Sequence, residues 1–407
     1  MKDETTILHT PYAQSDAYGA LNMPIYHTAA YEFTTAAQME LAFTGRSPEH
    51  VYSRVSNPTV RYFEDRVKAI VGTPYVLAFN SGMSAITAAL VVLGSAGANI
   101  VTSPHLFGNT YSLMANTLRF FGVEARFCDL TDMDEVSKHI DNHTCAVFLE
   151  VITNPQMEVV NLKTLSALCK QHGVPLIADT TIIPFTAFKA KDYGINIEIV
   201  STTKYISGGA TSLGGLLIDY NTFDWQVSPK LSPLILNNGN SAFFTKLSME
   251  VHRNLGVFMT AETAHLQTLG LETLSLRYDR ACTTCKALSE RLQNVKNVVS
   301  VNYPGLKSHP YYAVSKQQFG DYPGAMFTFD LKDRAAAFQF IDRLKLIRRA
   351  TNLFDNKTLA IHPASTIFGT FTEETRQQMN ISQNTIRMSI GLEDVDDLFN
   401  DIAQALQ

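Results

Sequence analysis

The chain has 407 residues, of which 45% are hydrophobic, and its 33 Lys and Arg against 38 Asp and Glu give a net charge of −5. This length exceeds one ordinary domain of roughly 100–200 residues, so two or more domains are expected. The mildly acidic balance and the lack of a Lys or Arg run argue against nucleic acid or an anionic membrane as a partner. No stretch approaches the ~18 apolar residues of a membrane span, and the start has no apolar signal segment. We therefore expect a cytoplasmic protein.

Residues 1–57 are predicted to form an arm that packs on another subunit. Pro11, Gly19 and Pro24 interrupt any long helix, and several tyrosines supply contact surface. The alternative is a loosely held N-terminal extension.

A strand over Tyr75–Phe79, a turn and a helix over Met83–Leu93 follow the arm. With Gly82 at the turn, the unpaired N–H groups at the start of such a helix form an anion site. The alternative is an ordinary turn between a strand and a helix. No G-x-G-x-x-G follows a strand and no Walker lysine is present, so a nucleotide site has little support.

Later strands end in charged or polar residues. The apolar run Val174–Ala178 ends in Asp179, and Ile197–Val200 leads through three hydroxyl residues to Lys204. Helices alternate with these strands, as at Leu162–His172, which favours a mostly parallel sheet with sites at the carboxyl ends of its strands. A lysine amine and a carboxylate at neighbouring strand ends suit pyridoxal 5'-phosphate, which needs a Schiff-base lysine and an acid for its pyridine nitrogen.

The later part of the chain predicts a second, smaller α/β domain. Residues 219–240 indicate a surface excursion or entrance loop, and residues 248–271 a long helix that joins the domains. We expect an arm at 1–57, a cofactor-binding large domain at 58–255 and a small domain at 256–407.

Several motifs, in this order, resemble the pyridoxal-phosphate enzymes of cysteine and methionine metabolism. That family includes cystathionine γ-synthase, cystathionine lyases, methionine γ-lyase and O-acetylhomoserine sulfhydrylase, and the resemblance implies a fold type I transferase. The motifs are Tyr52-Ser-Arg54, Asn57-Pro-Thr59, Ser81-Gly-Met83, Ser201-Thr-Thr-Lys-Tyr205 and His362-Pro-Ala-Ser365. Asn352–Thr358 resembles the sulfhydrylase branch's N-x-G-D-A-K-T, from which Phe354 and Asn356 depart.

The resemblance implies roles for most of the candidate residues. Lys204 would carry the cofactor and act as base, and Asp179 would hold the pyridine nitrogen. The phosphate would be bound by Gly82, Met83, Ser201 and Thr203 of one subunit and by Tyr52 and Arg54 of its neighbour. Asn154 would lie beside the ring oxygen of the cofactor and the substrate carboxylate, and Asn352 and Arg387 would also bind the substrate, Arg387 through its carboxylate. The alternative for Arg387 is a structural salt bridge. No metal is expected.

Phe107 stands where the family usually has a tyrosine that stacks on the pyridine ring and assists proton transfer. A phenyl ring still stacks, but it cannot carry a proton. Either Lys204 or Tyr111 takes over that transfer, or the activity differs from the usual one.

The resulting functional hypothesis is γ-replacement on an O-acylated homoserine by sulfide or a thiol, which gives homocysteine or a related thioether amino acid. The alternatives are a γ-elimination lyase acting on methionine, homocysteine or cystathionine, and a non-catalytic pyridoxal-phosphate-binding protein. Homo-oligomers are expected, with active sites shared across a dimer interface and dimers paired into tetramers. Cys282 and Cys285 form a C-x-x-C on a predicted helix, which we interpret as coincidence because no second pair completes a metal site.

Overall fold

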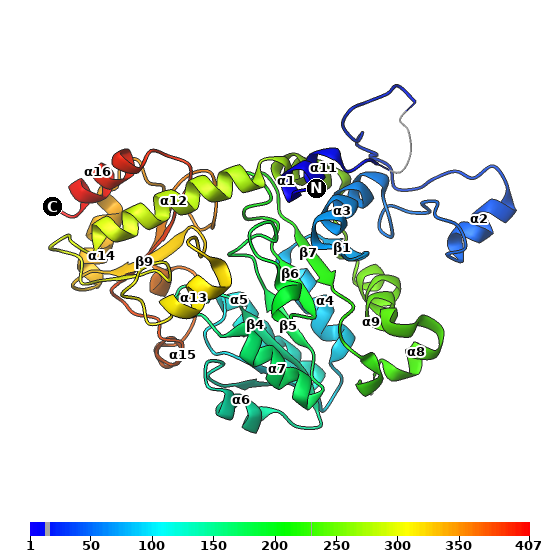
Figure 1. Ribbon diagram of the computed structural model, residues 1–407, viewed down its shortest axis with the longest axis horizontal. Helices are drawn as coiled ribbons and strands as arrows, with labels where there is room; N and C mark the ends of the chain where they lie inside the picture. Colours follow the sequence, from blue (N-terminus) through cyan, green and yellow to red (C-terminus); the bar gives the residue numbers. More distant parts are fainter. Residues whose placement is uncertain (13–16, 229) are drawn as a thin grey trace.

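The computed structural model describes residues 1–12, 17–228 and 230–407, which form two sheets connected by a long helix (Figure 1). In the described residues the larger sheet has seven strands in the order β1-β7-β6-β5-β4-β2-β3. They are β1 (Tyr75–Phe79), β2 (Asn99–Thr102), β3 (Glu124–Phe127), β4 (Thr144–Glu150), β5 (Leu176–Asp179), β6 (Ile197–Val200) and β7 (Gly215–Asp219). The pairs of β7 with β1 and with β6 are antiparallel and the other pairs are parallel, so the predicted mostly parallel sheet is confirmed.

The larger sheet is buried on both faces. Along β4, Val147 and Leu149 belong to one apolar cluster, whereas Ala146 and Phe148 belong to another on the opposite face. A parallel sheet needs cover on both sides, and helices on either side of the strands supply it (Figure 1). Because both faces are covered, a ligand can approach the sheet only at its strand ends, where the polar residues lie.

The smaller sheet is antiparallel, in the order β10-β11-β9-β8. Its strands are β8 (Ser300–Asn302), β9 (Met326–Asp330), β10 (Leu359–Ile361) and β11 (Thr385–Ser389). This confirms the smaller C-terminal α/β domain, while the predicted limits of the arm and of the two domains stay predictions.

The α-helices follow the predicted pattern in most places. Helix α7 has the bounds that the sequence predicts and ends at Gly173, whose φ of 65° lies in the left-handed region. The helices are α1 (Asp3–His9), α2 (Ala36–Phe43), α3 (Pro58–Val71), α4 (Gly82–Leu93), α5 (Gly108–Ser112), α6 (Met133–His139), α7 (Leu162–His172), α8 (Ser232–Asn238), α9 (Ala242–Lys246), α10 (Arg253–Leu255), α11 (Ala261–Glu272), α12 (Leu274–Leu292), α13 (Tyr312–Phe319), α14 (Arg334–Arg343), α15 (Glu373–Gln378) and α16 (Val395–Ala405).

Two predictions about the middle of the chain need correction. The expected single helix over 248–271 is broken at Gly256, and α12, which follows it, is the helix that runs from one sheet to the other (Figure 1). The surface excursion or entrance loop predicted at 219–240 is correct only in part, because α8 has no buried residue, whereas Trp225 is buried, with its ring stacked on Phe243 at 5.0 Å.

The first residues only partly behave as a free arm. Helix α1 buries Ile7, and Asp3 pairs with Lys189 at 2.5 Å. Beyond the undescribed residues, the chain extends away from the rest of the molecule and carries α2 at its far end (Figure 1).

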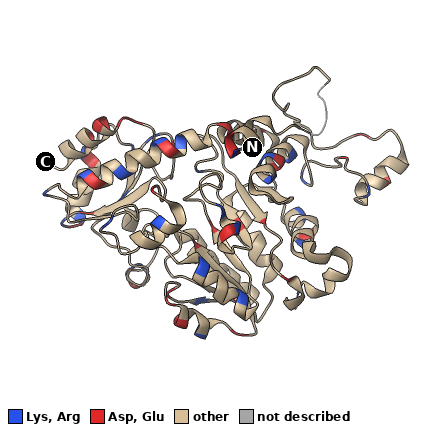
Figure 2. Cartoon of the chain, in the orientation of Figure 1, with Lys and Arg blue, Asp and Glu red and all other residues tan. Residues whose placement is uncertain are grey.

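Lys, Arg, Asp and Glu are interspersed along α12 and over the other elements (Figure 2). No described helix combines the length and apolar character needed to cross a bilayer. Within the described residues, no group of three or more His, Cys, Asp or Glu is arranged to hold a metal ion. Cys282 and Cys285 lie buried on α12 as free thiols, and burial raises the pKa of both.

Candidate active site

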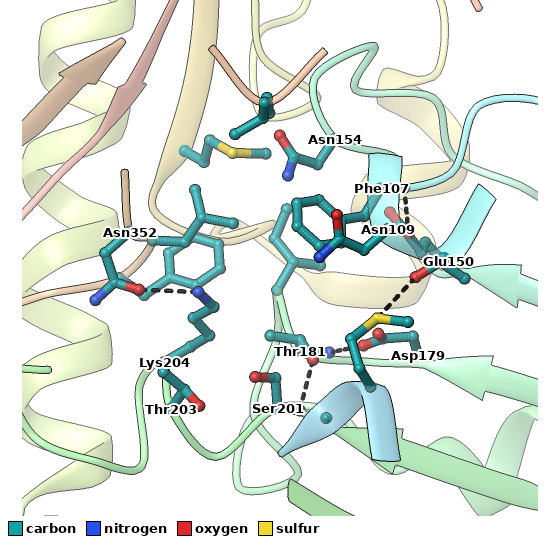
Figure 3. A pocket seen from close by; sticks show the side chains of 18 of the residues that line it. Phe107, Asn109, Glu150, Asn154, Asp179, Thr181, Ser201, Thr203, Lys204 and Asn352 are labelled. Atoms are coloured by element: carbon teal, nitrogen blue, oxygen red, sulfur yellow. Dashed lines mark hydrogen bonds between the residues drawn. The ribbon is translucent and has the colours of Figure 1, made fainter. Parts of the chain in front are cut away.

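The candidate site is a cavity of about 330 Å³ at the carboxyl ends of β4, β5 and β6 (Figure 3). Lys204 follows β6, and its Nζ donates to Asn352 Oδ1 at 2.8 Å. Burial, with the charge of Arg387 as the second cause, lowers the pKa of the Lys204 amine to about 8, although Asp179 opposes the shift. A larger fraction of this amine is therefore neutral near pH 7 than for an ordinary lysine.

Asp179 supplies a buried acid on the neighbouring strand. It ends β5, where it pairs in register with Ile199 of β6, and its Oδ1 accepts the backbone N–H of Thr181 at 2.9 Å. Burial raises the pKa of this carboxyl, whereas the Thr181 hydrogen bonds and the charge of Lys204 oppose the rise. Such a carboxylate would gain from a cationic or protonated partner inside the cavity.

The turn between β1 and α4 forms the end of the cavity suited to an anion. Ser81 caps α4 by accepting the N–H of Ser84, and the first N–H groups of a helix have no partner within it. Gly82 allows a close approach, because a Cβ there would lie 2.8 Å from the Cβ of Ser201. A Cβ at Gly215 would likewise collide with the backbone of Ser81. The turn is thus pressed against the segment that carries the lysine.

A buried guanidinium lies on another side of the cavity. Arg387 on β11 is 3% exposed, and it donates to Asn154 Oδ1 and to the carbonyl O of Asn352, each at 3.2 Å. Its buried Nε has no acceptor, and no ion pair of Arg387 occurs in the part of the chain that the structure describes. Burial lowers its pKa to about 9. The structural salt bridge considered as the alternative for Arg387 is therefore absent from these residues, and the guanidinium is free to bind an incoming carboxylate.

Phe107 and Glu150 line the cavity together. The backbone N–H of Phe107 donates to Glu150 Oε1 at 2.7 Å, and Glu150 pairs in register with Asp179. Burial, and then the charge of Asp179, raise the pKa of Glu150 to about 8. Glu150 was not predicted to have a role, although its position as a strand-end acid is the same signal that pointed to Asp179.

Most of the predicted site residues come together in this one cavity. Those that line it are Gly82, Met83, Phe107, Asn154, Asp179, Ser201, Thr203, Lys204, Asn352 and Arg387. Lining residues that sequence reasoning did not single out include Asn109, Glu150, Thr181 and Leu213.

Three predicted residues lie elsewhere. The ring of Tyr111 stacks on Phe127 at 4.8 Å and does not line the cavity. Tyr52 and Arg54 line a separate cavity of about 340 Å³ beside the arm, where Arg54 donates to the carbonyl of Arg253 at 2.8 Å. Within one chain they therefore do not reach the anion end.

Comparison with known proteins places this cavity in context. A model of the family described as "Cys/Met metabolism PLP-dependent enzyme" matches residues 4–407. The chain is 32% identical to O-acetyl-L-homoserine sulfhydrylase of Corynebacterium glutamicum over 416 residues, which cover 98% of this chain and 95% of that protein. It is 31% identical to L-methionine gamma-lyase of Pseudomonas putida over 405 residues, or 99% and 96% of the two chains.

Among solved structures, a putative O-acetylhomoserine (thiol)-lyase of Campylobacter jejuni is similar with a TM-score of 0.92 and 32% identity over the whole of both chains. That crystal structure contains a pyridoxyl-lysine monophosphate. The fold is therefore fold type I. The chain belongs to the Cys/Met metabolism PLP-dependent enzyme family, and its cofactor is pyridoxal 5'-phosphate.

Proposed function

We propose that this enzyme replaces the acyloxy group of an O-acylated homoserine with sulfide and so forms homocysteine. The observation that carries the proposal is the buried Arg387, which has no ion-pair partner among the described residues and lies in the same cavity as Lys204, so that the two offer a carboxylate site and a base. Support for the substrate comes from the similarity to an O-acetyl-L-homoserine sulfhydrylase along 98% of this chain.

The residues of the cavity fit pyridoxal phosphate. The α4 turn, with Ser201 and Thr203, would hold the phosphate, and the buried Asp179 would hold a proton at the pyridine nitrogen. Lys204 would supply the amine for covalent attachment, and Phe107 a ring for stacking. When bound, the cofactor supplies an electron sink for negative charge that develops at Cα and Cβ of the substrate.

The chain's own groups would then orient the substrate and move its protons. Arg387 would fix the α-carboxylate through two N–H groups, with Asn154 and Asn352 holding the guanidinium in place. The amine of Lys204 would remove protons from Cα and Cβ, a task favoured by its lowered pKa. Loss of the acyloxy group as a carboxylate and addition of sulfide at Cγ complete the replacement. We assign no step to Tyr111, because its ring packs on Phe127.

The second candidate is γ-elimination, favoured by the 31% identity to an L-methionine gamma-lyase. In that reaction water rather than sulfide consumes the unsaturated product, which yields a 2-oxo acid and ammonia.

A shared active site is also part of the proposal. Tyr52 is 43% exposed and Arg54 is partly exposed, and both belong to the predicted arm. In a homodimer they would reach the phosphate of the neighbouring subunit, where the planar guanidinium suits a phosphate. Pairing of dimers into tetramers and a cytoplasmic location stay predictions.

A product assay tests the function. Cofactor-loaded protein is given O-acetylhomoserine with and without sulfide, and homocysteine and 2-oxobutyrate are quantified, with Lys204→Ala as the inactive control. Homocysteine that depends on sulfide supports the proposal. If 2-oxobutyrate forms at the same rate with or without sulfide, elimination is the activity instead. If neither forms, the proposal is wrong for this substrate, and the non-catalytic reading gains support.

A further inference from the structure

Every second residue of the segment 352–356 contacts the segment that carries Lys204. Asn352 accepts from Lys204 Nζ at 2.8 Å. The ring of Phe354 stacks on Tyr205 with 4.2 Å between centroids and 10° between planes. Asn356 Nδ2 donates to the carbonyl of Gly208 at 2.8 Å. Three successive contacts thus fasten the lysine segment to the small domain.

Phe354 adopts an unfavourable backbone conformation. Its φ of 56° lies in the left-handed region, which bulky L-residues rarely adopt. The conformation is held by its N–H, which donates to Ser389 Oγ at 2.7 Å, and by a side chain that is only 2% exposed. Backbone outliers of this kind persist only where the surroundings enforce them, and they cluster at functional sites.

Tyr205 is fixed from its other sides as well. Its hydroxyl oxygen accepts the N–H of Ala325 at 2.9 Å, and its ring meets Tyr278 edge-on at 5.2 Å. Because Tyr205 directly follows Lys204 and is 3% exposed, its ring has little room to shift. The stacking of Phe354 therefore restrains the backbone from which the Lys204 side chain extends.

Asn356 acts on the other end of the lysine segment. Gly209 has a φ of 123°, and a Cβ there would lie 2.8 Å from Asn356 Nδ2. The absence of a side chain at Gly209 is thus what lets the amide reach the carbonyl of Gly208.

We propose that Phe354 and Asn356 are positioning residues, which act through Tyr205 and Gly208 to hold the Lys204 amine against Asn352 inside the cavity. These are the two positions at which the chain departs from the sulfhydrylase pattern. The inference rests on the assignment of Lys204 as the lysine that binds the cofactor.

The test measures how readily Lys204 bonds to the cofactor as pH changes. Protein loaded with pyridoxal phosphate is reduced with borohydride between pH 6 and 10, and mass spectrometry quantifies the labelled Lys204 peptide. In Phe354→Leu and Asn356→Ala the lysine is less confined and better solvated, so its pKa returns toward the ordinary value. Two charged groups face Lys204, namely Arg387 and Asp179, and both stay in place in the two variants.

We expect the labelling midpoint of both variants to move up by about one pH unit, which corresponds to a roughly tenfold loss of neutral amine at fixed pH. Phe354→Tyr keeps the ring, so its labelling midpoint should equal that of the unaltered protein. Phe340→Leu is the matched control, since Phe340 is an equally buried small-domain ring that packs on Phe329 and not on the lysine segment. It should destabilise the protein without moving the midpoint.

An unchanged midpoint in the two variants would overturn the inference. If Phe354→Leu does not fold, Asn356→Ala carries the same prediction, because it removes one hydrogen bond and no core volume. Labelling of a different lysine in the unaltered protein would overturn both the assignment of Lys204 and this inference. The labelling needs no turnover, so failure of the proposed reaction is recognised separately.

Discussion

The Lys204 amine donates a hydrogen bond of 2.8 Å to the side chain of Asn352, a residue 148 positions later in the chain. Lys204 follows a strand of the large sheet, whereas Asn352 precedes β10 of the small one. The carbonyl of the same asparagine accepts from Arg387. One residue of the small domain thus sets the relative position of the amine and the guanidinium.

Replacement of Lys204 by alanine should lower kcat roughly a thousandfold or more, because among the described residues no other lysine lines the cavity. The protein should still bind pyridoxal phosphate, since the α4 turn and Asp179 remain. Steady-state kinetics with absorbance of the bound cofactor test this. Undiminished turnover in the variant would rule out the proposed mechanism.

Asn352→Asp should move the acidic limb of the pH profile to higher pH. The substitution keeps the size of the side chain but places a negative charge beside Lys204 Nζ, and an opposite charge at this distance raises a lysine pKa by about 1–3 units. The activity at pH 7 should fall and should recover at higher pH. Asn352→Ala, which adds no charge, serves as the control and should not show that recovery.

Arg387→Lys should raise KM for the amino acid substrate about 10–100-fold while kcat changes little, because a single ammonium cannot reproduce the two parallel N–H bonds of a guanidinium. Arg66→Lys is a suitable control, as Arg66 is also buried but pairs with Glu272 at 2.7 Å outside the cavity. Equal effects of the two substitutions on KM would contradict the role of Arg387.

Phe107→Tyr restores the hydroxyl that the family usually has at this position. The ring can still stack, so any gain reports proton transfer alone, and we expect homocysteine formation to rise by about an order of magnitude. The rate of sulfide-dependent product formation checks this. An unchanged rate would mean that Lys204 or another group already moves the proton that a tyrosine would carry.

Glu150→Gln should change how stability depends on pH. The carboxyl has a folded pKa near 8 against 4.5 when unfolded, so the folded state binds more protons between these values and stability falls as pH rises through that window. The glutamine variant lacks this loss. Its free energy of unfolding, relative to that of the parent, should therefore rise by on the order of 3 kcal/mol between pH 5 and pH 9. Urea unfolding of the cofactor-free proteins measures the difference. The exposed Glu290→Gln should show no such trend.

The strand ends were predictable because their signals are local. β-branched runs followed by Asp179 and by Lys204 indicate both the strands and the edge at which the side chains gather. The end of α7 was equally clear from Gly173, which adopts the positive φ that stops a helix.

Features that depend on distant contacts were missed. Trp225 looks like part of a polar loop until Phe243 covers it, and only the break at Gly256 shows that α12 is the connecting helix. Glu150 carries the same strand-end signal as Asp179, but that it pairs in register with Asp179 is known only from the sheet. Tyr52 and Arg54 lie outside the cavity of their own chain, so their proposed contact with a neighbouring subunit follows from the family resemblance and not from local signals in the sequence.

The close packing of Gly82 on Ser201 and of Gly215 on Ser81 fixes the spacing between the anion end and the lysine by main-chain contact. The backbone therefore determines how long a cofactor the cavity can accept. Side chains around the substrate can be substituted, which can change the reaction catalysed, without altering the backbone contacts that select the cofactor. In this way, members of one family can catalyse either replacement or elimination with the same backbone around the cofactor.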